Sequence, residues 1–238
     1  MAAQRDHQRL ITEAAKQVLK PAGLVQKGRS RVWLDDHGWC LVQVEFQPMS
    51  GRRGSALNVG VCWLWAPRDH LSFDWGYRQG GFIEFRNEDQ FRLEAEKLAR
   101  DALMHVAQFR RQLASAADAV TGFEAGRGAP DEDWSLYFRA GLRGLAGDLE
   151  TARELLSKLI TLPTEHDWEK QRRRWAEGLR AAATTIEAFR HGLTKLVVEA
   201  RRLNKLPAWE GSLLPPSEPS LGVADELTAE AEKLGLGY

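Results

Sequence analysis

The sequence contains only two cysteines, and this scarcity excludes a scaffold held together by disulfides. It has no run of 18 apolar residues, and its first residues are polar and charged rather than the apolar stretch of a secretory signal. It also lacks an excess of one charge, because 33 basic residues balance 33 acidic ones. Proteins that bind polyanions usually carry a basic excess. We therefore expect a soluble, cytoplasmic protein that crosses no membrane, and the charge balance argues against nucleic acid as a partner.

Sequence motifs of catalysis are missing as well. There is no Gly-x-Ser-x-Gly nucleophile elbow. The loop Gly51–Ser55 is rich in glycine and arginine, but it lacks the Gly-Lys-Ser/Thr ending of a phosphate loop and precedes a strand rather than a helix. The acidic pairs Asp35-Asp36 and Glu88-Asp89 are expected in a turn and in the first turn of a helix, where carboxylates serve structure. We therefore predict no catalytic residue and no cofactor, and we favour a protein that is not an enzyme.

A zinc site is one further candidate, because His37, Cys40, Cys62 and His70 are residue types that bind zinc. Successive side chains of a strand point to opposite sides. Cys40 is in phase with the apolar residues of its strand-like segment, whereas Cys62 is out of phase with those of its own. The two sulfurs are therefore expected on opposite sides of a sheet, and we predict no metal site.

Three strand-like segments organise the first half of the chain. They are Arg31–Asp35, Trp39–Gln47 and Leu57–Trp65. Apolar and polar side chains alternate along the second and third segments, which is typical of half-buried strands. Turn-forming residues join the first two segments into a hairpin, and Phe82–Phe85 is a candidate fourth strand. We predict an α+β fold in which an antiparallel sheet of three to five strands is covered by helices.

Helical periodicity surrounds this sheet. We predict helices over Gln4–Leu19, from Asn87 to about Ala117, from Asp131 to near Gly147, and from Asp148 to just before Pro163. Asn87 followed by Gln90 is a capping-box pattern, which marks the start of the second of these helices.

The longest predicted helix runs from Thr164 to about Leu206. Apolar residues recur along it every seven positions: Trp168, Trp175, Ala182, Phe189, Leu196 and Leu203. Apolar companions follow several of them four positions later, which gives the heptad pattern of a coiled coil. Gln171–Arg174 lies between the two tryptophans of this series and is a candidate nucleic-acid contact. We interpret its arginines instead as the solvated flank of the helix.

These features divide the chain into four parts. We predict an α+β domain over residues 1–121, a glycine-rich linker over 122–130, a helical hairpin with the long helix over 131–206, and a proline-bearing tail over 207–238. The tail holds six acidic residues and one basic residue, which is typical of a solvated acidic segment.

Short motifs occur in a fixed order in the first half: Leu19–Leu24, Lys27–Arg29, the hairpin strands, and Ala56–Val61 with its Asn-hydrophobic-Gly-Val sequence. In this order they resemble a bacterial family known only as domain of unknown function 4304. Leu24 stands where that family usually has phenylalanine, and His70–Arg78 matches a later family loop only loosely. The resemblance covers roughly residues 5–120. It implies an α+β domain and brings no established activity.

A second, weaker similarity concerns Gly147–Leu159, which resembles the second helix of a tetratricopeptide unit. The preceding helix carries Arg143 where an aromatic residue is usual. Only one such unit is found in the sequence, whereas stable arrays need about three. We therefore interpret this region as a generic helical hairpin.

The polar side of the predicted sheet, together with the aromatic loop that follows it, is the candidate binding surface. It comprises Trp33, Gln43, Glu45, Asn58, His70, Asp74, Trp75, Tyr77 and Arg78. Aromatic residues and arginine are favoured anchors in recognition surfaces. The alternative is that these aromatic residues close the edge of a small core.

An assembly pattern without catalytic motifs favours a non-enzymatic interaction protein of unknown pathway. Its 165–206 helix would bind a protein partner or a second copy in a homodimer, and the polar sheet face would be the second surface. The alternative is an enzyme or a nucleic-acid-acting component that uses the loop 68–78, with Arg52, Arg53 and Arg78 around a substrate.

Overall fold

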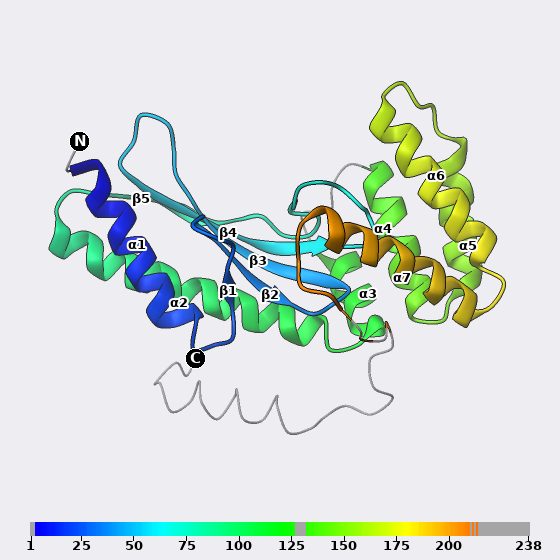
Figure 1. Cartoon of the computed structure of the whole chain (residues 1–238), viewed down its shortest axis with the longest axis horizontal. Helices are drawn as coiled ribbons and strands as arrows, with labels where there is room; N and C mark the ends of the chain where they lie inside the picture. The colour runs from blue at the N-terminus through cyan, green and yellow to red at the C-terminus, as the bar shows by residue number, and fades with distance from the viewer. Residues whose placement is uncertain (1–2, 127–131, 210, 212, 214–238) are drawn as a thin grey trace.

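The structure, a computed structural model, describes residues 3–126, 132–209, 211 and 213. Its centre is a five-stranded antiparallel sheet in which each strand pairs with the next one along the chain (Figure 1). The strands are β1 (Val25–Gln26), β2 (Val32–Asp36), β3 (Cys40–Gln47), β4 (Gly54–Trp63) and β5 (Arg78–Glu84). The α+β fold predicted from the alternation of apolar and polar residues is therefore confirmed. The short β1 had not been predicted.

The two central strands explain why the sheet has one apolar face. Val42 lies opposite Val61, and Val44 lies opposite Val59, so both strands direct these side chains to the same side. The predicted hairpin between β2 and β3 is also present, and Gly38 in its turn has a φ of 81°. A β-carbon at Gly38 would also come within 2.2 Å of the indole nitrogen of residue 209, so both the turn and the packing require glycine.

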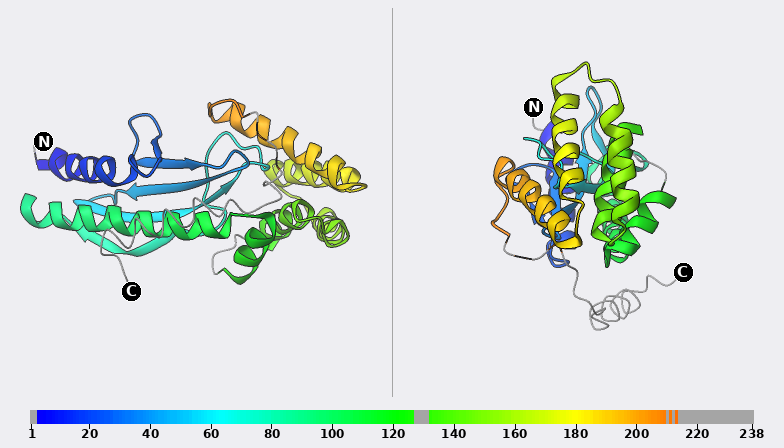
Figure 2. Two further views of the ribbon diagram at one scale, coloured as in Figure 1. Left: turned by 90° about the horizontal axis from the view of Figure 1, so that it is seen from below. Right: turned by 90° about the vertical axis from the view of Figure 1, so that its right-hand side faces the viewer.

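Two long helices, α1 (Ala3–Leu19) and α2 (Glu88–Gln112), pack against each other and cover the apolar face of the sheet (Figures 1 and 2). Asn87 caps α2 as predicted, because its side chain accepts a hydrogen bond from the Gln90 amide at 2.9 Å. The sequence pattern therefore located the start of this helix correctly.

A separate helix, α3 (Ala116–Ala125), occupies the start of the predicted linker. α2 ends before the predicted Ala117 because Ser115 acts as the N-cap of α3. Gly122 was expected to provide flexibility, but it lies within α3, where a β-carbon would come within 2.8 Å of the Trp75 ring. This glycine therefore serves close packing. Residues 127–130 of the predicted linker lie outside the described residues, as does most of the predicted tail.

The helical region at the other end of the molecule contains two hairpins within the described residues (Figure 2). They are α4 (Glu132–Leu145) with α5 (Leu149–Thr161), and α6 (Asp167–Ala182) with α7 (Ile186–Leu203). The single helix predicted from Thr164 to Leu206 is therefore wrong. Thr185 interrupts it, because its hydroxyl accepts a hydrogen bond from the Ala188 amide at 3.1 Å and so caps α7. Of the heptad series only Phe189 is buried, together with the companion residues Leu179, Leu193 and Ala200, where the two halves fold onto their neighbours.

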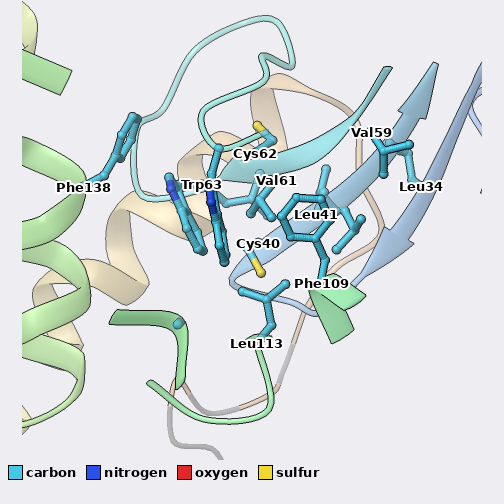
Figure 3. Close-up of a cluster of buried hydrophobic side chains, with 14 of the residues drawn as sticks. Leu34, Cys40, Leu41, Val59, Val61, Cys62, Trp63, Phe109, Leu113 and Phe138 are labelled. Carbon is cyan, nitrogen blue, oxygen red and sulfur yellow. The ribbon is translucent and has the colours of Figure 1, made fainter. Parts of the chain in front are cut away.

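The helix α4 joins this region to the sheet. A β-carbon on Gly141 would lie 2.7 Å from the Trp65 indole nitrogen, and one on Gly144 would lie 2.1 Å from the Phe189 ring. The Tyr137 hydroxyl donates a hydrogen bond to the Trp65 carbonyl at 2.8 Å. One apolar core therefore continues from the sheet into the helical region, and Figure 3 shows part of it. None of the helices in the described ranges has the length and apolarity needed to span a membrane.

Candidate functional site

The sheet face opposite α1 and α2, here called the outer face, carries most of the polar residues predicted for the binding surface. Glu45 lies opposite Asn58 in the β3–β4 pairing, and Gln43 and Gln47 share their side. The Asn58 amide nitrogen donates to Glu45 at 2.8 Å and to Gln47 at 3.3 Å, and Arg78 donates to the same Gln47 oxygen. Glu45, Gln47, Asn58 and Arg78 therefore form one hydrogen-bonded network.

Trp33 does not belong to this network. It pairs with Val44 in the β2–β3 register and so points to the apolar face, where it is 3% exposed. Because alternate residues of a strand face opposite sides, a residue in phase with Val44 cannot share the face of Gln43 and Glu45. The predicted place of Trp33 on the polar side is therefore wrong.

The loop between β4 and β5 contributes buried residues rather than an open surface. Asp74 accepts hydrogen bonds from the Trp63 amide at 2.8 Å, from Arg68 at 2.7 Å and from the Ser72 hydroxyl at 2.8 Å. Burial disfavours the charge on Arg68, but the Asp74 carboxylate outweighs this effect and raises the pKa of Arg68. Trp75 is also buried and stacks on Trp63, with ring centroids 6.0 Å apart. Both Asp74 and Trp75 therefore hold the loop against the core.

Tyr77 and Arg78 are adjacent exposed residues where the chain enters β5. Tyr77 is 51% exposed, and its ring centroid lies 5.6 Å from that of Phe73. The guanidinium carbon of Arg78 lies 5.6 Å from the Tyr77 centroid, and this side chain is exposed too. His70 is exposed elsewhere in the loop. We define the outer-face patch as the network residues that reach solvent together with this tyrosine: Glu45, Gln47, Tyr77 and Arg78.

Two adjacent aspartates of β2 fasten the sheet to helices on its two sides. On the apolar face, Arg110 of α2 donates to both oxygens of Asp35, each at 2.8 Å. On the outer face, Arg201 of α7 donates to both oxygens of Asp36, at 2.9 and 2.7 Å. Burial raises the pKa of each carboxyl, but the arginine hydrogen bonds outweigh it and leave both pKa values below their usual range. The sequence indicated a structural role for this acidic pair, but it did not indicate which arginines bind it.

A cluster of stacked rings that sequence reasoning missed lies between α4 and α6. The rings follow the order Phe138, Trp134, Trp168 and His166, with centroid separations of 5.4, 6.1 and 6.1 Å. The guanidinium carbon of Arg172 lies 4.9 Å from the Trp134 centroid and 5.1 Å from the Trp168 centroid. Arg172 is buried, so its interpretation as a solvated flank residue is wrong. Its position four residues after Trp168 was the available signal, because residues at that spacing share one side of a helix.

A hollow of about 670 Å³ lies between β5 and α2. Its charged lining residues are Arg52, Arg86, Lys97, Glu84, Glu94 and Asp101. Arg52 is already engaged, because it lies 4.1 Å over the Phe82 ring and pairs with Glu84 at 3.9 Å. The remaining charged residues are of both signs, and we assign the hollow no catalytic role.

The two cysteines lie on opposite faces of the sheet, as predicted (Figure 3). Cys40 pairs with Trp63 in the β3–β4 register, whereas Cys62 pairs with Leu41. Burial raises the pKa of both thiols, that of Cys62 to about 12. Within the described ranges, no group of three or more histidine, cysteine or acidic side chains is arranged to hold a metal ion.

Neither a family model, nor a curated protein, nor a solved structure matches this chain. The resemblance of the first half to domain of unknown function 4304 stays a prediction.

Proposed function

We propose that this chain is a non-enzymatic interaction module that binds a protein partner through the outer-face patch. The observation that carries this proposal is the exposed pair Tyr77 and Arg78, where the chain enters β5 at the edge of the sheet (Figure 1). Tyrosine and arginine are enriched among the residues that dominate binding energy, because each combines a large contact area with hydrogen-bonding groups.

The hydrogen-bonded network beneath the patch supports the same proposal. Gln47 accepts hydrogen bonds from both Arg78 and the buried Asn58, and Asn58 is tied in turn to Glu45. Arg78 is therefore held over the sheet before a partner arrives, which lowers the entropy lost on binding. Its charge suits a carboxylate of the partner, and the adjoining Tyr77 ring suits an apolar side chain.

The segment 165–206 has less support as the docking surface than its heptad pattern suggested. Phe189, Leu179, Leu193 and Ala200 of its pattern are buried inside the chain, while Trp168 and Val198 are exposed large hydrophobic residues of this segment. Docking of a partner or a second copy through this segment stays a prediction. The alternative of a substrate-binding loop at 68–78 would draw on Asp74 and Trp75, which are buried.

The test compares the full chain with the double variant Tyr77→Ala/Arg78→Ala. Partners captured from a lysate of the source cells are quantified by mass spectrometry, and each is then purified and titrated against both proteins. We expect at least one partner whose dissociation constant rises about 100-fold in the double variant, because two anchor residues of a small interface are removed. The thermal midpoint should be nearly unchanged, because both side chains are exposed.

The matched control is Leu93→Ala, which truncates an exposed apolar residue on α2 and should leave the same partner bound. Light scattering on the wild type and the double variant would show whether the partner is a second copy. Equal affinity of every partner for the wild type and the double variant would contradict the proposal. Co-purified nucleic acid, seen as a raised absorbance ratio, would instead support the alternative function.

A further inference from the structure

Arg172 is a buried cation whose hydrogen-bonding groups are incompletely used. Its Nη2 donates to the Asp133 carboxylate at 2.7 Å. Its Nε and Nη1 are also buried, and neither has an acceptor among the described residues. A buried donor without an acceptor is unfavourable, and folded proteins usually satisfy such groups with a side chain, a water molecule or an ion. An acceptor beyond the described residues is therefore expected at this guanidinium.

The surroundings of Arg172 hold its guanidinium in place without accepting its remaining protons. The guanidinium lies beside the stacked pair Trp134 and Trp168, about 5 Å from each ring centroid, and indole rings attract a cation without offering the directed lone pairs of an oxygen. The Asp133 carboxylate is about one third exposed to solvent, so it compensates the buried positive charge only partly. The guanidinium is thus fixed in orientation, with donors left over.

No neighbouring charged group among the described residues accepts a hydrogen bond from the Arg172 Nε or Nη1 group. Arg68 also approaches the Trp134 ring, at 5.1 Å, and it adds a second cation that is paired with Asp74. Glu169 is the acidic residue of the same helix turn, but its carboxylate accepts hydrogen bonds from the amides of Glu165 and His166 at the start of α6. Neither Asp74 nor Glu169 accepts a hydrogen bond from the Arg172 Nε or Nη1 group, although the Glu169 carboxylate is close enough to interact with the Arg172 charge.

Two helix first turns lie at this place, and both also carry acidic side chains: Glu132 and Asp133 in α4, and Asp167 and Glu169 in α6. Trp134 lies in the first turn of α4 and Trp168 in the first turn of α6, and their rings stack. The first turns of the two helices are therefore linked beside Arg172 through these side chains. Helix N-termini carry partial positive charge and favour anions, which here complements the guanidinium.

We propose that Arg172 anchors a site for an oxyanion, the carboxylate or phosphate group of a ligand, between the first turns of α4 and α6. The Nε and Nη1 groups donate to the oxyanion while Nη2 keeps its bond to Asp133. Trp168 is 48% exposed and forms the outer wall, so a change in its side-chain orientation opens the path from solvent to the guanidinium.

Nuclear magnetic resonance tests the site on the full-length protein. The side-chain Nε–H signal of Arg172 is identified by its loss in the variant Arg172→Lys, which keeps the charge but lacks these donors. Sodium phosphate or sodium acetate then replaces sodium chloride at constant ionic strength. We expect a saturable shift of this signal with at least one of the two anions. Tighter binding of phosphate would assign a phosphate-bearing ligand, and tighter binding of acetate a carboxylate-bearing one.

The matched control is Arg174, which is exposed on the same helix and whose signal is identified by its loss in Arg174→Lys. Its signal should show no saturation. The bound anion should also raise the thermal midpoint of the wild type and of Arg174→Lys, but not of Arg172→Lys. The proposal is wrong if neither anion gives a saturable shift up to about 10 mM, well above a millimolar dissociation constant. A rise in midpoint that Arg172→Lys retains would overturn it as well.

Discussion

Arg201 and Arg172 are equally buried arginines that differ in how their donors are used. They are 4% and 2% exposed, and they belong to neighbouring helices, α7 and α6. Arg201 donates to both Asp36 oxygens, to the Gly38 carbonyl and, through two nitrogens, to the Pro207 carbonyl. Arg172 donates to Asp133 and has two nitrogens without an acceptor in the described part of the chain.

This comparison separates a structural arginine from a candidate binding residue. Arg201 joins three parts of the protein: the β2–β3 turn, α7 and the segment that follows α7. All three of its nitrogens are engaged within the chain, so little remains for a ligand. Arg172 has the same charge and similar burial but retains donor capacity beside two stacked aromatic rings. Burial alone therefore does not reveal the role of a charged residue, whereas the pairing of donors with acceptors does.

The largest loss of stability is expected for Arg201→Met. This change leaves the Asp36 carboxylate and the carbonyls of Gly38 and Pro207 without their donor, so the free energy of unfolding should fall by about 3 kcal/mol. Urea denaturation followed by circular dichroism measures the change. Arg202→Met is the control, because this exposed neighbour pairs only with Glu199 among the described residues and should cost less than about 1 kcal/mol. Equal losses in the two variants would show that the Arg201 contacts add no stability.

The next largest effect is expected at the opposite face of β2, with Arg110→Met. Burial raises the pKa of Asp35, but hydrogen bonds from Arg110 and His37 outweigh it, so the pKa is depressed. A depressed carboxyl pKa stabilises the fold above the unfolded value of about 4, and this stabilisation is lost as the pH falls through the folded pKa. At pH 7 the variant should lose about 2 kcal/mol.

Measurements of unfolding free energy between about pH 7 and pH 2 test the sign of this linkage. The difference between the wild type and Arg110→Met should shrink towards acid pH, because protonated Asp35 no longer attracts the guanidinium. A difference that stays constant over this range would mean that Arg110 acts by packing rather than by charge.

The fold could be predicted from sequence where the signal is local. The alternation along Trp39–Gln47 and Leu57–Trp65 is enough to identify two strands, and Asn87 with Gln90 is enough to locate a helix start. The predicted long helix failed because an N-cap at Thr185 competes with helix continuation only when the chain can fold back onto a buried surface. That surface belongs to α4, and the heptad pattern of residues 168–203 contains no information about packing against another helix.

The candidate site was harder to predict because it depends on strand register and on pairs of residues that lie far apart in the sequence. Trp33 is flanked by the apolar Val32 and Leu34, so its segment has no clear alternation, and only pairing with Val44 assigns its face. The partners Arg201 and Asp36 are separated by 165 positions. No local pattern identifies such a pair, whereas the cross-strand pairing of Glu45 with Asn58 follows from two well-patterned strands.

A smaller loss of stability is expected for Gly144→Ala. This change tests the packing of α4 against α7, the helix that also carries Arg201. The added methyl group would lie 2.1 Å from the Phe189 ring, so either the ring or α7 must move. Overpacking of this kind costs about 1–3 kcal/mol. The control is Gly178→Ala in α6, where a β-carbon meets nothing within 4 Å and better helix propensity should add up to about 1 kcal/mol. Stabilisation by both substitutions would contradict the close approach of α4 and α7.

The smallest effect is expected for Arg172→Met, and it gives the sharpest test of the comparison. Without added anion, the lost pair with Asp133 and the lost indole contacts are offset by the removal of two donors that lack acceptors. The free energy of unfolding should therefore change by less than about 1 kcal/mol, as measured by urea denaturation. Added oxyanion should stabilise only the wild type, so the difference between the two proteins should grow with anion concentration. A loss as large as that of Arg201→Met, independent of anion, would make Arg172 a structural residue of the same kind as Arg201.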